Sequence, residues 1–452
     1  MIVREIEWRD PISAFAPLAG EPFAQFLGGG AKADGARWSF LCVRPASLIE
    51  VRRGETKVDG AEVAKAPFEA LRDLHERRRR NVDSAAVPLL SGVVGFAGYE
   101  CGGVLEPSAA GPPSTGAAPD FLFAAYDAVA AFDRQARRAF IGAPDRPRAL
   151  ALEALLGDAP YAPSPPALSF SGSTFSAARY RDAVRDVINR ILDGAVYQAN
   201  ISHRLRFKAD EPVDAFALFA AAAAQSAAAH GAYLNLGATQ IVSLSPERFF
   251  SINHDAYGRT IRAEPIKGTR PRGATPEEDA AFIRQLEEST KDRAENIMIA
   301  DLTRNDLSRI CVEGSIREEA ICERLTLATV HHLVSRISGR LREDVGAPEA
   351  LAALFPCGSI TGAPKVEAMR IIAAIEGAPR GPYCGAIGYI DDRGGADFSV
   401  AIRTALVEER RVTLPVGGGV TLRSDPEAEY QETLDKAAWF LRLVGAERAS
   451  LA

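Results

Sequence analysis

The sequence lacks the cysteine spacing and the excess of basic residues that would assign it to several common classes of protein. Its six cysteines, at positions 42, 101, 311, 322, 357 and 384, form no CxxC pair and no metal-ligand spacing. This distribution argues against a disulfide scaffold or a structural zinc site and is typical of a reduced, cytoplasmic enzyme. The formal net charge of -6 provides no basic field, so we expect no nucleic-acid partner.

The sequence also lacks a long, strongly hydrophobic run. Its N-terminal stretch, MIVREIEWRDP, is charged and has no apolar core of a signal peptide. The most apolar tract, residues 215–234, is rich in alanine and is interrupted by Gln225, Ser226 and His230. Such a tract is too weakly hydrophobic to cross a bilayer, so we expect a packed helix and no membrane partner.

The remaining composition is that of a globular enzyme, with 47% hydrophobic and 25% charged residues. The Pro-rich stretch 157–166 predicts a linker, which divides the chain into an N-terminal subdomain (1–165) and a catalytic domain (166–452). Short apolar segments joined by hairpin-length connections at 391–396 and 408–411 favour antiparallel pairing. The sequence therefore predicts an α+β fold.

Two helices are predicted from their N-terminal signals. Thr275 and Pro276 form a capping residue followed by proline at the first helical position, which predicts one helix through residues 279–302. The sequence Ser-Asp-Pro at 424–426 predicts a second helix that runs to Gly445.

Each of these helices carries carboxylates on one face. Asp292 and Glu295 are three residues apart on the first helix, and Glu429, Glu432 and Lys436 share a face of the second. Facing carboxylate pairs offer the oxygen ligands that Mg²⁺ prefers. The same spacing is also found on ordinary solvated helix surfaces, and the spacing alone leaves both interpretations open.

Lys267 lies in the stretch EPIKGTRPRG (264–273), which is bracketed by glycine and proline. Three roles fit it: a surface turn lysine, an anion contact or a nucleophile. A nucleophilic lysine must be neutral, which requires its pKa to fall from about 10.4 to near 7, a difference of about 4 kcal/mol. Nearby guanidinium groups such as those of Arg270 and Arg272, a metal ion or burial would each favour this change.

Several further motifs have two readings each. GSITGAPK (358–365) departs from the spacing of a nucleotide-binding loop, which leaves an anion-binding turn or a simple helix cap. The glycines at 417–419 permit either close approach of a ligand or a tight turn.

We expect one of His331 and His332 to be packed and the other to lie near a site. Arg403 is a charge within an apolar strand, hence an edge residue or a buried anion binder.

Ten motifs occur in an order that resembles the chorismate-utilising enzymes, a family of anthranilate, aminodeoxychorismate, isochorismate and salicylate synthases. The motifs are VYQANIS, LSPERFF, PIKGTRPRG, KDRAENIMIADLTRNDLSRIC, VHHLVSRISG, GSITGAPKVEAM, YCGAIGY, VAIRTA, GGGV and SDPEAEYQETLDKA. They cover essentially all of residues 170–445. The resemblance implies large antiparallel β-sheets packed as a sandwich with helices around them.

Within this family, PIKGT resembles the aminodeoxychorismate synthases, because anthranilate synthases usually carry alanine in place of Lys267. The resemblance implies that Lys267 attacks C2 of chorismate with loss of the 4-hydroxyl. Ammonia then enters at C4 and expels the lysine, giving 4-amino-4-deoxychorismate for 4-aminobenzoate and folate synthesis. Anthranilate synthase, in which ammonia enters at C2 and pyruvate is eliminated, is the alternative.

The resemblance also assigns roles to single residues. Glu247 corresponds to the general acid, and His332 to an active-site position. Glu295 and Glu432 correspond to direct Mg²⁺ ligands, with Asp292 and Glu429 in the outer shell. The substrate-binding positions are Ser359, Tyr383, Arg403, Gly419 and Lys436. Cys357 and residues 421–423 depart from the usual family pattern beside this site.

A glutamine amidotransferase subunit is the implied source of ammonia, because no cysteine lies in a GxCxG turn. The lyase that would release 4-aminobenzoate is expected to be a different protein. Two rival classes remain: a pyridoxal-phosphate enzyme with Lys267 as the Schiff base, and a non-catalytic chorismate sensor. A sensor would need neither the acid Glu247 nor the nucleophile Lys267.

Overall fold

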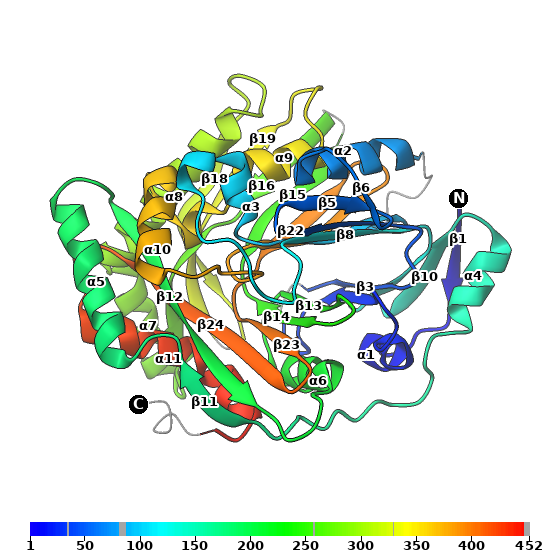
Figure 1. Cartoon of the computed structure of the whole chain (residues 1–452), viewed down its shortest axis with the longest axis horizontal. Helices are drawn as coiled ribbons and strands as arrows, with labels where there is room; N and C mark the ends of the chain where they lie inside the picture. Colours follow the sequence, from blue (N-terminus) through cyan, green and yellow to red (C-terminus); the bar gives the residue numbers. More distant parts are fainter. Residues whose placement is uncertain (34–35, 81–86, 256–257, 329, 447–452) are drawn as a thin grey trace.

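Apolar segments throughout the chain form the strands of two large antiparallel sheets (Figure 1). The computed structural model describes residues 1–452 except 34–35, 81–86, 256–257, 329 and 447–452. Every strand pairing recorded in this described part is antiparallel, as the hairpin-length connections predict. The expected α+β class is therefore confirmed.

Sheet 1 contains twelve strands, of which β20 pairs with β12 off the main path. In order across the sheet they are β1 (Ile2–Ile6), β10 (Arg138–Ala143), β9 (Val129–Asp133), β3 (Trp38–Cys42), β2 (Gln25–Gly28), β13 (His230–Asn235), β14 (Gln240–Ser245), β23 (Thr404–Glu408), β24 (Arg411–Val420), β12 (Gln198–Lys208) and β11 (Ser169–Ser173), with β20 (Gly362–Ala363) beside β12.

Sheet 2 also contains twelve strands, of which β18 pairs with β19 off the main path. In order they are β17 (Ile266–Pro271), β19 (Val330–Arg340), β16 (Gly258–Ala263), β15 (Arg248–Asp255), β22 (Ala396–Val400), β21 (Ala386–Asp391), β7 (Gly92–Ala97), β8 (Phe121–Tyr126), β4 (Ser47–Arg52), β5 (Glu55–Val58) and β6 (Ala61–Glu62), with β18 (Arg317–Thr326) beside β19.

Helices cover the outer faces of the two sheets (Figure 1). They are α1 (Pro11–Phe15), α2 (Pro67–Arg78), α3 (Cys101–Leu105), α4 (Arg146–Glu153), α5 (Ala177–Leu192), α6 (Ala215–Gln225), α7 (Pro276–Glu287), α8 (Thr290–Ser308), α9 (Ala347–Leu354), α10 (Lys365–Glu376) and α11 (Pro426–Leu443), with short 3₁₀ turns η1 (Ala16–Leu18), η2 (Pro107–Ala109) and η3 (Gly358–Ile360). None of the helices in the described ranges is both long and apolar enough to cross a membrane.

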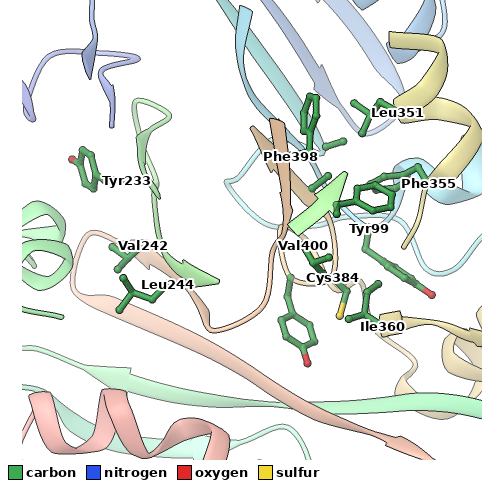
Figure 2. Close-up of a cluster of buried hydrophobic side chains, with 14 of the residues drawn as sticks. Tyr99, Tyr233, Val242, Leu244, Leu351, Phe355, Ile360, Cys384, Phe398 and Val400 are labelled. Carbon is green, nitrogen blue, oxygen red and sulfur yellow. The ribbon is translucent and has the colours of Figure 1, made fainter. Parts of the chain in front are cut away.

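The two sheets pack face to face around an apolar core. Phe40 of sheet 1 meets Tyr389 of sheet 2 edge to face, with ring centroids 5.4 Å apart. Figure 2 shows part of the core, with Val242 from sheet 1 and Phe398 and Val400 from sheet 2. Strands such as β7, β8 and β21 are buried at every position, because sheet and helices cover both of their faces. The expected sandwich is thus confirmed.

The predicted division at residue 165 stays a prediction. Residues 161–168 form no helix or strand, which agrees with a linker. Both sheets nevertheless combine strands from each side of this point: β2 pairs with β13 in sheet 1, and β7 pairs with β21 in sheet 2.

Three local expectations were wrong, and one of two open alternatives was excluded. The helix predicted across 279–302 is two helices, because Ser289 caps a new one by accepting from the backbone N–H of Asp292. The alanine-rich tract forms helix α6 and then strand β13. The glycines at 417–419 lie inside β24, so a tight turn is excluded. Arg403 is not within a strand but in the bend between β22 and β23, with a φ of 50°.

Candidate active site

Lys267 lies on β17 at one end of sheet 2, where it pairs with Leu333 of β19. The register shifts between Lys267 and Thr269, and Gly268 between them has a φ of +83°. A Cβ at Gly268 would come within 2.9 Å of the Asp292 Cβ, so the glycine lets this strand approach α8 closely. The proline- and glycine-bracketed stretch thereby holds Lys267 against the helix that carries the predicted metal ligands.

The side-chain nitrogen of Lys267 points toward a small-residue turn and a glycine strand. Its Nζ donates to the carbonyl oxygen of Ser359 at 3.1 Å. A Cβ added at Gly419 of β24 would lie 3.5 Å from this Nζ. The half-buried lysine is therefore directed into the protein, which removes the reading as an ordinary surface turn lysine.

Glu247 is a buried carboxyl group between β14 and β15. Burial raises the pKa of Glu247, and the hydrogen bond with Ser359 and the charge of Lys267 offset only part of this effect. A carboxyl group with a raised pKa retains its proton at higher pH, which is what a general acid requires. Glu247, Ser359 and Lys267 are thus three interacting groups.

The carboxylates of α8 face different partners. Asp292 forms an ion pair with Arg270 at 3.0 Å, which ties α8 to β17. Burial raises the pKa of Glu295, while Lys267 and Lys291 act in the opposite direction. Glu295 Oε1 is buried and has no hydrogen-bond partner within the described part of the chain.

The carboxylates of α11 lie across from them. Glu429 accepts a hydrogen bond from the Ser424 hydroxyl at 2.6 Å through Oε1, while its buried Oε2 has no hydrogen-bond partner among the described residues. Glu432, whose side chain is 50% exposed, pairs with Lys436 at 2.8 Å, and the charge of Lys436 lowers the pKa of Glu432. Lys436 also donates to the carbonyl oxygen of Gly417.

This donor set fits a hard divalent cation. Glu295 and Glu429 each present a buried oxygen with no hydrogen-bond partner among the described residues, and oxygen is the ligand type that Mg²⁺ takes. Within the described ranges, no group of three or more acidic, histidine or cysteine side chains is gathered closely enough to hold a metal ion alone. Mg²⁺ usually keeps several waters and substrate oxygens, so a partial set of protein ligands agrees with its chemistry.

The two adjacent histidines are both buried and have separate hydrogen-bond partners. His331 is fully buried and is hydrogen-bonded to Asp279 and Thr326. His332 Nδ1 is hydrogen-bonded at 2.8 Å to the hydroxyl of Thr269. Thr269 follows Lys267 by two residues on β17. Burial and the charge of Arg403 lower the pKa of His332 to about 4, which keeps its ring neutral at pH 7.

Arg403 and Tyr383 lie on the loops that flank sheet 2. The Arg403 side chain is accessible to solvent yet surrounded by protein, and the partial loss of hydration lowers its pKa. Tyr383 is buried, with the guanidinium group of Arg380 centred 6.0 Å from its ring. Their predicted contacts with a substrate carboxylate remain predictions.

Three polar groups beside these positions were not singled out from the sequence. Gln198 of β12 is fully buried, both its amide atoms lack a hydrogen-bond partner within the described chain, and its Nε2 would be 2.7 Å from a Cβ at Gly419. Lys291 contacts two of the carboxylates, and Arg380 is a buried cation. Gln198 lies in the motif VYQANIS, where an amide among apolar strand residues was the available signal.

The fold of the chain agrees with its similarity to known proteins. The model of the chorismate binding enzyme family matches residues 29–442. The chain therefore belongs to the chorismate binding enzyme family. It is similar to the anthranilate synthase component I of Streptococcus pneumoniae, whose crystal structure superposes with a TM-score of 0.77 at 27% identity over 91% of this chain and 93% of that one.

Curated relatives include proteins of two different names. An aminodeoxychorismate synthase of Streptomyces pristinaespiralis is 39% identical over 80% of this chain, and the chain spans only 52% of that relative's length. Aminodeoxychorismate synthase component 1 of Klebsiella aerogenes is 34% identical over 95% of this chain and 96% of its own length. Relatives named anthranilate synthase component 1 also match.

Proposed function

We propose that this chain aminates chorismate at C4 to give 4-amino-4-deoxychorismate, in an Mg²⁺-dependent transferase reaction. The observation that carries this proposal is the position of Lys267, which reaches past Ser359 toward Gly419 and interacts with the buried Glu247. The names of the relatives in Streptomyces pristinaespiralis and Klebsiella aerogenes support the same activity.

The reaction runs in two displacements on the ring. The neutral amine of Lys267 forms a bond to C2, the ring double bonds shift, and the 4-hydroxyl leaves as water with the proton of Glu247. Ammonia then bonds to C4, the double bonds shift back, and the C2–N bond to Lys267 breaks. A proton from the added nitrogen returns to Glu247, so chorismate and ammonia give aminodeoxychorismate and water while the enolpyruvyl group stays attached.

The other side chains orient the substrate. Glu295 and Glu432 would hold Mg²⁺ directly, with Asp292 and Glu429 behind them. When bound, the ion supplies positive charge that neutralises and fixes the ring carboxylate. Arg403, Tyr383 and the backbone at Gly419 would receive the enolpyruvyl carboxylate.

Ammonia is proposed to come from a glutamine amidotransferase subunit, with free ammonium as a substitute in vitro. The term "component 1" in the name of the Klebsiella aerogenes relative supports a multicomponent enzyme. The product would feed 4-aminobenzoate and folate synthesis in the cytoplasm.

The test is substitution of the proposed nucleophile. We expect Lys267→Ala to abolish C4 amination or divert the product, while calorimetry still detects Mg²⁺-dependent chorismate binding. Lys57→Ala, at a surface lysine of β5, serves as the matched control and should retain full activity. Undiminished aminodeoxychorismate output from Lys267→Ala would remove this residue from the mechanism.

Anthranilate synthase activity is the second candidate, because relatives of that name also match this chain. It would deliver ammonia to C2 and release pyruvate. Lys267 argues against it, since a lysine that attacks C2 occupies the carbon at which ammonia would have to enter.

A further inference from the structure

Lys291 extends from α8 into the space between the carboxylates of α8 and α11. Its Nζ lies 3.4 Å from Glu429 Oε1 and 3.9 Å from Glu295 Oε1. These contacts make the Lys291 ammonium group a positive charge shared by Glu295 and Glu429.

This arrangement differs from an ordinary pair on a helix surface. Lys291 and Glu295 are four residues apart on α8, but Glu429 belongs to a different helix and its side chain is only 4% exposed. Glu429 Oε2 and Glu295 Oε1 are buried oxygens of these carboxylates that lack a hydrogen-bond partner among the described residues. Buried carboxylates without a nearby cation are strongly unfavourable, so Lys291 compensates the charge of Glu429 and, together with Lys267, that of Glu295.

A divalent cation at Glu295 would compete with this ammonium group for the buried Oε1 of that carboxylate. Mg²⁺ binds carboxylate oxygens at about 2.0–2.1 Å, and an ammonium group in contact with those oxygens would face it at short range. The Lys291 side chain is 39% exposed and flexible, so it can rotate into solvent. Lys436, by contrast, is also anchored to the backbone at Gly417.

We propose that Lys291 is an internal counter-ion that neutralises Glu295 and Glu429 in the metal-free enzyme and is displaced when a divalent cation binds. Metal binding is then an exchange of cations, and Lys291 sets the affinity. This inference rests on the proposed function only in placing the metal at Glu295 and Glu432.

The experiment measures metal binding without substrate. Wild type, Lys291→Met and Lys65→Met are titrated with Mg²⁺ and Mn²⁺ by calorimetry at constant pH and ionic strength. Lys65 pairs with Asp73 on the surface, so Lys65→Met removes the same positive charge at a position away from these carboxylates. We expect Lys291→Met to bind both ions about tenfold more tightly or better, and Lys65→Met to match wild type.

Thermal unfolding provides a second readout. In chelator, Lys291→Met should melt at a lower temperature than wild type, and saturating Mg²⁺ should raise its melting temperature by more than that of wild type. Lys291→Arg, which keeps the charge, should behave like wild type in both measurements. An unchanged or weaker metal affinity of Lys291→Met would overturn the proposal.

Two further measurements separate this inference from the proposed function. Retention of metal binding by Glu295→Gln and Glu432→Gln would show that the metal site itself is misplaced, which would overturn both. Wild-type formation of aminodeoxychorismate together with an unchanged metal affinity of Lys291→Met would overturn only the role of Lys291.

Discussion

The buried ion pair between Arg380 and Glu376 allows the effect of a single substitution to be worked out from the structure. The Arg380 side chain is 1% exposed and the Glu376 side chain 4% exposed. Arg380 donates to both carboxylate oxygens of Glu376, at 2.6 and 3.0 Å, and to the carbonyl oxygens of Ile360 and Asn200. The Arg380 guanidinium group also lies over the rings of Tyr99 and Tyr383, and Tyr383 is a predicted substrate-binding residue.

Arg380→Met would leave the Glu376 carboxylate buried with the backbone N–H and hydroxyl of Ser202 as its remaining donors among the residues that the structure describes. Removing one partner of a buried ion pair costs about 3–5 kcal/mol, so we expect the free energy of unfolding to fall by about 4 kcal/mol. Arg185→Met, which breaks an exposed pair with Asp182 on α5, should cost less than about 1 kcal/mol.

The assay is urea unfolding followed by fluorescence, with a double-substitution cycle. Glu376→Gln removes the charge but keeps an oxygen that can accept from Ser202. The pair Arg380→Met/Glu376→Gln should therefore be more stable than Arg380→Met alone by about 2 kcal/mol, because no buried charge is left unpaired. A loss below about 1 kcal/mol for Arg380→Met, or no recovery in the double variant, would refute this reasoning.

Two further predictions concern buried carboxyl groups. Glu247→Gln should lower kcat with chorismate and ammonium by about 10²–10⁴-fold and leave chorismate affinity within a few-fold, because it removes the proton donor; a normal kcat would exclude Glu247 as the acid. Burial raises the pKa of Glu100 from 4.5 to about 7, although its carboxylate accepts from the backbone N–H groups of Arg380 and Gly381. A raised folded-state pKa gives stability that is present below pH 4.5 and is lost as the pH rises through 7, so wild type should lose about 3 kcal/mol more than Glu100→Gln between pH 4.5 and 8 in urea titrations. Parallel pH profiles for wild type and Glu100→Gln would contradict this assignment.

Local signals in the sequence were sufficient for several elements of the fold. Asp425 and Pro426 gave the start of α11, because the carboxylate caps the first turn and proline suits the first helical position. The carboxylates of α11 therefore could be placed on one face without the structure. The antiparallel sheets followed from short connections between apolar segments.

Other features depend on contacts between distant segments. Ser289 lies in a charged, helix-compatible stretch, so the local sequence did not predict that it caps α8. Its side chain accepts a hydrogen bond from the backbone N–H of Asp292. Gly419 pairs with Asn200 across β12 and β24, and this pairing brings it close to the Gln198 side chain. The partner of Lys291 on α11 is 138 residues away. A local sequence pattern does not predict contacts between residues that lie so far apart in the chain.

The central claim, that nitrogen enters chorismate at C4, is tested most directly by the product of the wild-type chain. Purified protein is incubated with chorismate, Mg²⁺ and ammonium at alkaline pH, and the products are analysed by mass spectrometry with and without an added aminodeoxychorismate lyase. The account predicts a product that retains the enolpyruvyl group and yields 4-aminobenzoate only when the lyase is present. Release of pyruvate and anthranilate without the lyase would contradict it.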